Sequence, residues 1–386
     1  MNYSHFVGLD VGKKSFDACL MSLDQELSHH TFPNTPEGIE ELLHWVKQHG
    51  VEVETALFCA ENMGSHVIDL CLSSYQYHFP LALECPLTIK KSIGLQRGKN
   101  DRIDARRIAQ YASLHYRKLR LYELPDKDLV RLRNWLVIRD NLVKQKVSSL
   151  KLLELTRETS RLADLMVPMT FLENQICQIK EKISYVEEEM EKIITENITL
   201  STNYRLLTSI KGIGPVNAIV LLCVTDNFQR FSDPRKFACY SGVAPFEYSS
   251  GTSIRGKTKT SHLANREVKV YLTRAAITAI AWDPQIKAYY KRKIAEGKHK
   301  ASVINAVRAK IIARCFAVIK RKTPFVTLSA WVNQMREGKI IFLFESLSQI
   351  TRFLKRKRSG AGGEEKKIAI KINFITIFCV KNLVET

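Results

Sequence analysis

The sequence predicts three successive parts: an α/β N-terminal domain, a long helical coiled-coil spacer and a mainly α C-terminal domain. Over residues 1–120, short apolar runs alternate with amphipathic stretches, which is the pattern of a mixed sheet with flanking helices. Over residues 125–203 glycine is absent and heptad spacing appears. Helical patterns interrupted by glycine turns then occupy residues 204–330, so these three ranges are the expected domains.

The composition favours a protein that binds nucleic acid. The 386 residues include 59 Lys and Arg against 39 Asp and Glu, a net charge of +20, and such an excess suits polyanions; a role in solubility alone is the alternative. The nine cysteines are scattered singly, which argues against a zinc site or a disulfide framework. With no membrane-length apolar run and no signal peptide, we expect a cytoplasmic, nucleoid-associated protein without a membrane partner.

The first expected element is a β-hairpin with an aspartate near the centre of its first strand. An apolar run from His5 contains Asp10, a Gly-Lys turn follows at Gly12, and a second apolar run begins at Ser15. A buried carboxylate without a partner is costly. Asp10 is therefore expected to have a cation or a hydrogen-bond donor beside it.

The next elements continue the alternation of strands and helices. A third strand is expected at Leu27–Thr31, followed by a helix that Asn34 or Thr35 caps and that ends near residue 50. The continuous apolar run Thr55–Glu61 predicts a central strand covered on both faces, with a carboxylate at its carboxyl end. The series closes with a helix at Gly64–Ser73, a strand at Phe79–Glu84 and a helix at Pro86–Ile93.

Two more carboxylates open the helix that follows a basic loop at Gly94–Asn100. Asp101 and Asp104 are three residues apart and lie on one helical face; for Asp101, stabilisation of the helix dipole is the alternative role. With Asp10 and Glu61 they make four hard oxygen donors from two strands and one helix, the ligand type that Mg²⁺ prefers. The four residues therefore predict a magnesium site for phosphodiester chemistry.

Three segments carry a resemblance to a known family. They are Gly-Leu-Asp-Val-Gly-Lys-Lys from Gly8, Ala-Glu-Asn-Met-Gly from Ala60 and Lys-Asn-Asp-Arg-Ile-Asp-Ala-Arg from Lys99. They resemble the DEDD signature of the insertion-sequence one-ten transposases, a family that includes the Piv-type DNA invertases. The resemblance covers residues 1 to about 330 and implies an N-terminal domain with a RuvC-like, ribonuclease H fold. It implies the catalytic and metal-binding residues Asp10, Glu61, Asp101 and Asp104. One departure is Asn-Met-Gly after the glutamate, where Thr-Gly is more usual.

The spacer carries a heptad seam of apolar residues. Spacings of four and three alternate from Leu172 to Ile193, and a looser seam runs from Leu129 to Leu150. Pro168 would break a single helix, so two long antiparallel helices are expected. They predict an arm for assembly of a homo-oligomer, a dimer or tetramer; a hairpin within one chain is the alternative.

The C-terminal domain begins with a segment that looks like a helix–hairpin–helix motif, Leu206–Ala218. In that motif, glycine amides and a helix N-terminus approach a phosphate without reading base sequence. Gly212 and Gly214 would leave room for the phosphate, and Lys211 would add charge. An ordinary αα-turn in a core is the alternative.

A hairpin-like loop over residues 243–257 contains the serines Ser249, Ser250 and Ser253. Serine is a weak nucleophile at neutral pH unless a base or clustered cations support the reaction. From the residues alone, a plain phosphate-binding turn is the more common interpretation. The resemblance implies instead that Ser250, in its Ser-Gly segment, is the nucleophile, with adjacent Ser249 as a competing assignment. The cations expected to bind nucleic acid around it are Arg255, Lys257, Lys259 and Arg266.

These features predict a DNA transposase or site-specific recombinase that uses Mg²⁺ and a serine nucleophile. The resemblance further implies a structured noncoding guide RNA as a partner. Three alternatives stay open: a RuvC-like Holliday-junction nuclease that needs no serine, a phosphotransferase of the actin and sugar-kinase type, and a DNA-binding protein without activity. Residues 331–386 form a tail to which we assign no function.

Overall fold

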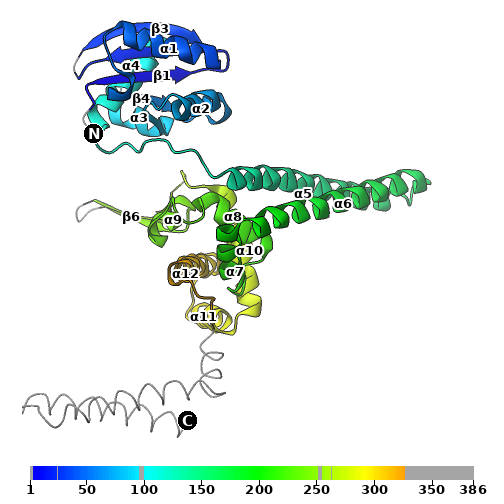
Figure 1. The fold of residues 1–386 in the computed structure, drawn as a ribbon. Helices are drawn as coiled ribbons and strands as arrows, with labels where there is room; N and C mark the ends of the chain where they lie inside the picture. The colour runs from blue at the N-terminus through cyan, green and yellow to red at the C-terminus, as the bar shows by residue number, and fades with distance from the viewer. Residues whose placement is uncertain (1–2, 24, 95–99, 251–253, 262, 327–386) are drawn as a thin grey trace, which may run out of the picture. The chain divides into compact units, whose positions relative to one another are not determined.

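The computed structural model describes residues 3–23, 25–94, 100–250, 254–261 and 263–326. The chain divides into two compact units, Met1–Lys127 and Asp128–Thr386 (Figure 1). The predicted spacer and the C-terminal helices therefore belong to one unit. Three predicted segments lie outside the described residues: most of the basic loop (95–99), the tip of the serine loop (251–253) and the tail (331–386).

A five-stranded mixed sheet forms the centre of the first unit, as predicted. Its strands are β1 (His5–Val11), β2 (Ser15–Met21), β3 (Glu26–Pro33), β4 (Ala56–Glu61) and β5 (Leu81–Glu84). The order across the sheet is β3-β2-β1-β4-β5. β1 and β2 are the expected antiparallel hairpin, which β3 extends, whereas β4 and β5 run parallel to β1.

Helices cover both faces of this sheet (Figure 1). They are α1 (Pro36–Gln48), α2 (Ile68–Gln76), α3 (Pro86–Ile93) and α4 (Asp101–His115), with the 3-10 turns η1 (Val53–Thr55) and η2 (Gly64–Val67). Thr35 caps α1 by accepting a hydrogen bond from the Gly38 amide. Side chains alternate between the faces along a strand. The odd-numbered residues of β1 therefore pack with α1 and α2, whereas Phe6, Gly8 and Asp10 face α4.

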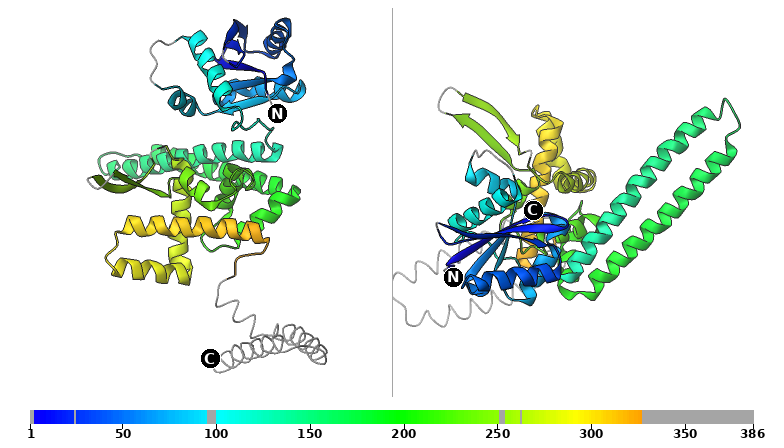
Figure 2. Two further views of the ribbon diagram at one scale, coloured as in Figure 1. Left: turned by 90° about the vertical axis from the view of Figure 1, so that its left-hand side faces the viewer. Right: turned by 90° about the horizontal axis from the view of Figure 1, so that it is seen from above.

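Two long helices open the second unit. They are α5 (Lys127–Thr159) and α6 (Met166–Glu196). Arg139 Nε lies 2.6 Å from Glu187 Oε1, and Arg157 Nη2 lies 2.7 Å from Glu173 Oε1. Residues further along α5 thus meet residues earlier in α6, so the two helices form an antiparallel hairpin within one chain (Figure 2).

The predicted seam of α6, from Leu172 to Ile193, is buried at every heptad position. The seam predicted for α5 is buried only in its first half. Leu132 is fully buried, but Val147 and Leu150 expose 45% and 43% of their surface. At the outer end of the arm it is Leu153 of α5 that packs against Leu172 and Ile176 of α6.

As far as residue 326, where the described part of the chain ends, the rest of the second unit is helical with one β-hairpin, as predicted. Its elements are α7 (Ile198–Thr208), α8 (Pro215–Thr225), α9 (Pro234–Tyr240), β6 (Pro245–Ser250), β7 (Ile254–Thr260), α10 (Arg266–Trp282), α11 (Pro284–Ala295) and α12 (Lys300–Arg321). The helices share one apolar core. A buried ion pair joins two of them, because Asp283 caps α11 and pairs with Arg314 of α12 at 2.6 Å.

Candidate functional site

Strands β1 and β4 place two of the predicted carboxylates side by side. The strands are parallel, and Leu9 pairs with Ala60. Asp10 and Glu61 each follow a paired residue by one position. They therefore lie at the same level and on the same face of the sheet, with their backbones about 5 Å apart. Both residues are partly buried.

Helix α4 crosses this face in the direction opposite to β1. A Cβ on Gly8 would lie 2.2 Å from the carbonyl oxygen of Ala105, so strand and helix touch at their backbones. Phe6, earlier in β1, shares an apolar cluster with Ala112, later in α4. Asp10 lies two residues beyond Gly8, about 7 Å further along the strand. The first turn of α4, which carries the other two carboxylates, therefore lies near Asp10.

Asn100 sets the beginning of α4. Its Oδ1 accepts a hydrogen bond from the Ile103 amide at 2.8 Å, so it is the N-cap residue. Asp101 is consequently not needed as the cap. It is exposed, whereas Asp104 is partly buried and lies 2.8 Å from Arg107 Nη1. The two predicted acids thus differ in their surroundings although they share one helical face.

The four predicted carboxylates act on one another electrostatically. Burial, followed by the negative charges of Asp104, Asp101, Glu61 and Asp17, raises the pKa of Asp10 to about 6. Burial disfavours the charged form of a carboxyl group, and nearby like charges do the same. Asp10 therefore lies in a concentration of negative charge contributed by neighbouring strands and by α4.

Sequence reasoning missed two acids of the same row. In the sheet register, Asp17 of β2 is opposite Asp10, and Glu84 of β5 is beside Glu61. Asp17 Oδ1 is bonded by His29 Nε2 at 2.8 Å and by the Thr31 hydroxyl at 2.9 Å. The sequence contained a signal for both acids, because each lies in a predicted strand at the position that pairs with one of the two predicted carboxylates.

Glu84 is paired with a tyrosine of α4. The hydroxyl of Tyr111 is hydrogen-bonded to Glu84, and burial together with that charge raises the pKa of Tyr111 to about 12. Hydrogen bonds therefore anchor the two outer acids of the row to neighbouring elements, Asp17 to β3 through His29 and Thr31, and Glu84 to α4 through Tyr111.

Mg²⁺ fits the donor set, because the four predicted ligands are all carboxylates, without thiolate or imidazole. Within the described part of the chain, no three His, Cys, Asp or Glu side chains stand within reach of one metal ion. The acids are thus close enough to raise the pKa of Asp10 but are not gathered around one point. Like charges repel one another, and Asp104 is paired with Arg107 at 2.8 Å.

Replacing Asp10 by Asn is expected to stabilise the metal-free protein above pH 6. The raised pKa lets the folded state hold a proton that the unfolded state releases, so stability falls as pH rises from about 4 to about 6. Asn removes that cost, and we expect the melting temperature at pH 7.5 in EDTA to rise by roughly 2–4 °C. Thermal melts at pH 4 and 7.5 measure this. Glu54→Gln at an exposed site is the control, and a lower melting temperature for Asp10→Asn at pH 7.5 would contradict the electrostatic account.

The predicted serine nucleophile lies at the end of β6. Ser250 pairs with Ile254 of β7, and Ser249 pairs with Arg255. β7 also carries Lys257 and Lys259, so the hairpin brings basic residues and both serines into one ribbon. The side chains of these hairpin residues lie outside what the structure describes.

Arg266, another predicted nucleic-acid contact, is the first residue of α10 and is exposed. Asn265 caps this helix by accepting a hydrogen bond from the Val268 amide at 3.1 Å. Its amide nitrogen also donates to the hydroxyl of Tyr240 at 3.1 Å. The cap thereby ties the start of α10 to α9.

The predicted helix–hairpin–helix glycines differ in their surroundings. Gly212 has a φ of +104°, and a Cβ there would lie 2.7 Å from the carbonyl oxygen of Ala275 in α10. Because Gly212 has no side chain, α10 can pack directly against this turn. At Gly214 no atom lies within 4 Å of the Cβ position, and Lys211 is exposed, so open space is found on that side of the turn.

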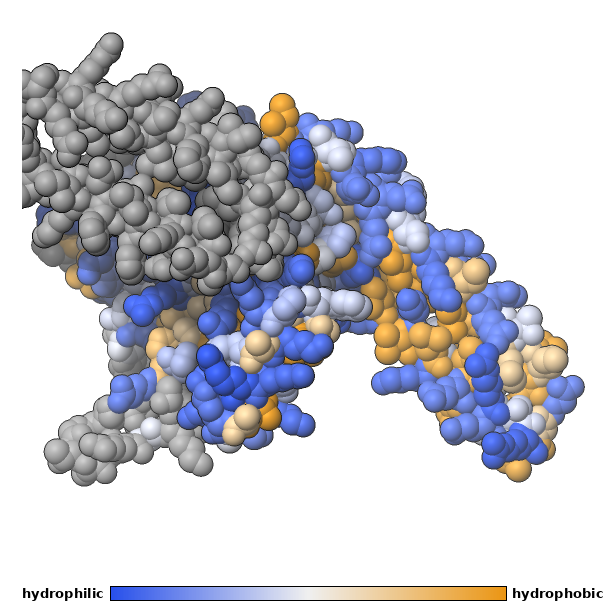
Figure 3. Space-filling model, turned by 90° about the horizontal axis from the view of Figure 1, so that it is seen from below, coloured by the Kyte–Doolittle hydropathy of each residue, from blue (hydrophilic) through white to orange (hydrophobic). Residues whose placement is uncertain are grey.

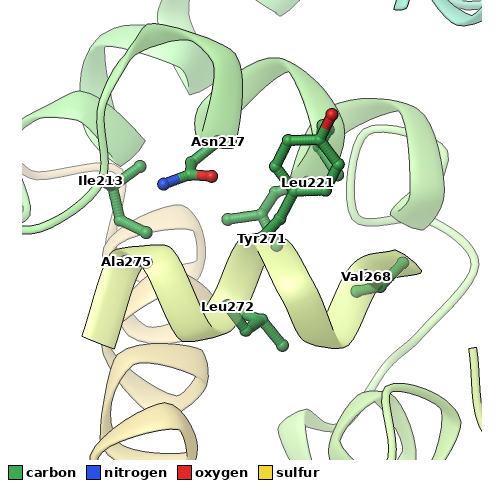
Figure 4. A pocket seen from close by; sticks show the side chains of 8 residues that line it. Ile213, Asn217, Leu221, Val268, Tyr271, Leu272 and Ala275 are labelled. Carbon is green, nitrogen blue, oxygen red and sulfur yellow. The ribbon is translucent and has the colours of Figure 1, made fainter. Parts of the chain in front are cut away.

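A small crevice separates the start of α8 from α10. It is lined by Ile213, Asn217, Val220, Leu221, Val268, Tyr271, Leu272 and Ala275 (Figure 4). The hydroxyl of Tyr271 is hydrogen-bonded to Asp140 at 2.5 Å. The remaining lining is almost entirely apolar, so the crevice belongs to the packing of the helices.

Within the described residues, the longest helices carry too many polar side chains for any of them to cross a membrane.

Two transposase models match the chain. A model described as a transposase, of the DEDD type named after IS110, matches residues 7–165. A model described as the transposase IS116/IS110/IS902 family matches residues 204–291. The first range contains all four predicted carboxylates, and the second contains the predicted serine.

Relatives cover most of the chain. The pilin gene-inverting protein of Moraxella lacunata is 27% identical over 327 residues, which is 83% of this chain and 97% of that protein. Its namesake in Moraxella bovis is 26% identical over 327 residues, with the same coverage of both chains. The uncharacterized 43.6 kDa protein of insertion element IS110 from Streptomyces coelicolor is 29% identical over 160 residues, 42% of this chain and 38% of that protein.

Among solved structures, the chain is similar to Thermus thermophilus RuvC. RuvC in complex with a Holliday junction substrate is 10% identical, with a TM-score of 0.26 over 31% of this chain and 100% of that chain. RuvC alone is 12% identical, with a TM-score of 0.23 over 31% of this chain and 99% of that chain.

The matching models and relatives define the class of this protein as a DNA transposase or recombinase. The chain belongs to the IS110 family of transposases, to which both matching models refer.

Proposed function

We propose that this transposase cuts and rejoins DNA with the four carboxylates Asp10, Glu61, Asp101 and Asp104 and the hydroxyl of Ser250. The observation that carries the proposal is the concentration of negative charge that raises the pKa of Asp10 to about 6. Like charges held together cost stability, and perturbed acids of this kind are concentrated at functional sites. The names of the relatives, which concern DNA inversion and an insertion element, support DNA as the substrate.

The first unit supplies the metal site. Asp10, Glu61, Asp101 and Asp104 would hold Mg²⁺, which when bound polarises a scissile phosphate and neutralises its developing charge. Gly8 keeps α4 against β1, so the acids of the strands and of the helix stay neighbours. Asp17, held by His29 and Thr31, keeps its own carboxylate directed to β3.

The second unit supplies the nucleophile. Ser250 Oγ would form a bond to phosphorus while the bond between phosphorus and a sugar oxygen breaks, and the serine proton ends on the leaving oxygen. The phosphoserine ester keeps the energy of the broken bond. A hydroxyl of another DNA strand then attacks the phosphorus, and the serine oxygen leaves and regains a proton. Strands are thereby exchanged without ATP.

A structured noncoding guide RNA and further copies of this chain complete the proposed complex. The net charge of +20 favours two polyanionic partners. We propose that the complex works in the cytoplasm, at the nucleoid.

Covalent protein–DNA adducts test this function. Purified protein is mixed with its flanking genomic DNA and co-purifying RNA, with and without Mg²⁺, and analysed under denaturing conditions. We expect adducts in Mg²⁺ and none in EDTA. Free 5′-phosphate ends without adducts would favour the junction-nuclease alternative instead. Neither adducts nor cleaved ends in the wild type would leave only DNA binding, and an Asp101→Asn variant with unchanged product would show that this carboxylate is not catalytic.

Assembly is proposed to use the arm of α5 and α6. Apolar side chains gather along this arm (Figure 3), and Leu155 and Phe171 near its outer end expose 56% and 68% of their surface. We expect the double variant Leu155→Glu/Phe171→Glu to lower the mass of the assembly by at least half in sedimentation, because buried charge opposes association. Gln145→Glu on the same arm is the control. A wild-type chain that sediments as a monomer would refute this role.

A further inference from the structure

Two cations lie together at the base of the serine hairpin. Lys269 of α10 has its ammonium nitrogen 3.4 Å from the hydroxyl of Thr260, the last residue of β7. The same nitrogen lies 3.7 Å from the position that a Cβ on Gly242 would occupy. Arg308 of α12 donates to Asn305 Oδ1 at 3.1 Å.

Asn305 fixes this arrangement. Its amide nitrogen donates to the carbonyl oxygen of Val243 at 2.8 Å, in the segment that leads into β6. Arg308 is thus oriented by a residue that is itself bonded to the hairpin base. The left-handed φ of Gly242, +65°, and the absence of a side chain keep the space beside Lys269 free.

Neither cation has an acidic partner in the described part of the chain, where neither residue takes part in a salt bridge. Arg308 Nε is fully buried and has no hydrogen-bond acceptor. A buried donor without a partner destabilises the fold, and more strongly when the group is charged. Arg314 of the same helix is placed differently, because it is paired with the buried Asp283.

The two positive charges act on each other. Burial, followed by the charge of Arg308, lowers the pKa of Lys269, and burial lowers the pKa of Arg308. An anion placed between them would relieve the repulsion and accept a hydrogen bond from the free Nε.

We propose that Lys269 and Arg308 together bind a backbone phosphate of the DNA that the transposase cuts. The proposal rests on the proposed function, because it identifies the bound polyanion as the substrate. Pro245 of β6 pairs with Thr260, and Ser250 is five residues further along that strand, about 17 Å away. The bound phosphate is therefore a flanking phosphate that positions the strand, and Lys269 and Arg308 are positioning residues.

DNA is favoured over RNA by this location. The cation pair lies at the base of the ribbon that carries the predicted nucleophile, where Lys269 contacts Thr260 of β7. A DNA strand that reaches the serine along this ribbon would be held at that base. Guide RNA binding at this point is the competing outcome, which a parallel measurement with RNA resolves.

Substitution of Lys269 by Met tests the site, because Met keeps an apolar stem and removes the charge. Binding to a duplex is measured over a salt series. One lost phosphate contact should weaken binding roughly fivefold at moderate salt and reduce the magnitude of the slope of log K against log salt by about 1. Lys151→Met, at an exposed site on α5, removes the same charge and should leave the slope unchanged. Arg308→Met should match Lys269→Met.

Thermal melts keep the test independent of folding defects. Loss of one of two repelling cations should leave the melting temperature of Lys269→Met unchanged or higher, whereas a purely structural lysine would lower it. Inorganic phosphate should stabilise the wild type and should stabilise Lys269→Met less.

Four outcomes would overturn the proposal. They are an unchanged salt slope, a lower melting temperature of the lysine variant, equal stabilisation of both proteins by phosphate, and a loss of affinity for RNA but not for DNA. The two proposals can fail separately. If the wild type forms no adducts but the salt slopes are as predicted, the serine mechanism is refuted and the phosphate site is still supported.

Discussion

Replacing Ser250 by Ala is expected to abolish covalent protein–DNA adducts and strand exchange, a loss of at least about 10³-fold. Alanine has no oxygen that can bond to phosphorus, so the phosphoserine ester that would conserve the energy of the broken phosphodiester bond cannot form. DNA binding should stay within about twofold of the wild type, because the basic residues of β7 are unchanged. Adducts are quantified by denaturing gel, and binding by fluorescence anisotropy.

Ser249→Ala is the matched control for this experiment. The two serines are adjacent in β6, so Ser249→Ala removes a hydroxyl from the same segment and leaves Ser250 in place. If Ser250 is the nucleophile, Ser249→Ala should keep adduct formation. Adducts formed by Ser250→Ala and lost in Ser249→Ala would move the assignment by one residue. Adducts formed by both variants would exclude both serines.

Replacing Gly8 by Ala is expected to cost about 2–4 kcal/mol of folding free energy and to abolish activity. The added Cβ would lie 2.2 Å from the carbonyl oxygen of Ala105 and 2.2 Å from the amide nitrogen of Ala109. Both are backbone atoms of α4, so the whole helix must move away from β1. Asp101 and Asp104 would then move away from Asp10.

Thermal melts and adduct assays measure this effect, and the melting temperature should fall by roughly 10 °C. Gly50→Ala is the control, because Gly50 has a φ of +73° but open space around its Cβ position, so it should cost only about 1 kcal/mol. A Gly8→Ala protein that melts like the wild type and forms adducts would show that close contact between α4 and β1 is not required.

The mixed sheet could be predicted because its signals are local. Two apolar runs separated by a Gly-Lys turn located the β1–β2 hairpin, and the continuous apolar run that ends at Glu61 located β4. Thr35 was correctly expected among the capping residues of α1, and the helix at Pro86–Ile93 was predicted to the residue. Each of these features depends on residues close in sequence.

The contacts between distant segments could not be predicted in the same way. Nothing next to Gly8 in the sequence shows that the backbone of α4 passes within contact of it. Gly212 was expected to make room for a phosphate, yet α10 occupies the space beside it. The pairing of Lys269 with Arg308 depends on two helices and a hairpin, separated by tens of residues.

Iron-directed cleavage tests the central claim, that Asp10, Glu61, Asp101 and Asp104 serve one metal ion. Fe²⁺ in place of Mg²⁺, with ascorbate and peroxide, generates radicals that cut the polypeptide near the bound ion. We predict cuts close to residues 10, 61 and 101–104 in the same sample, suppressed by excess Mg²⁺ and lost in Asp10→Asn. Cuts at only one of these segments, or a pattern unchanged in Asp10→Asn, would contradict the shared site.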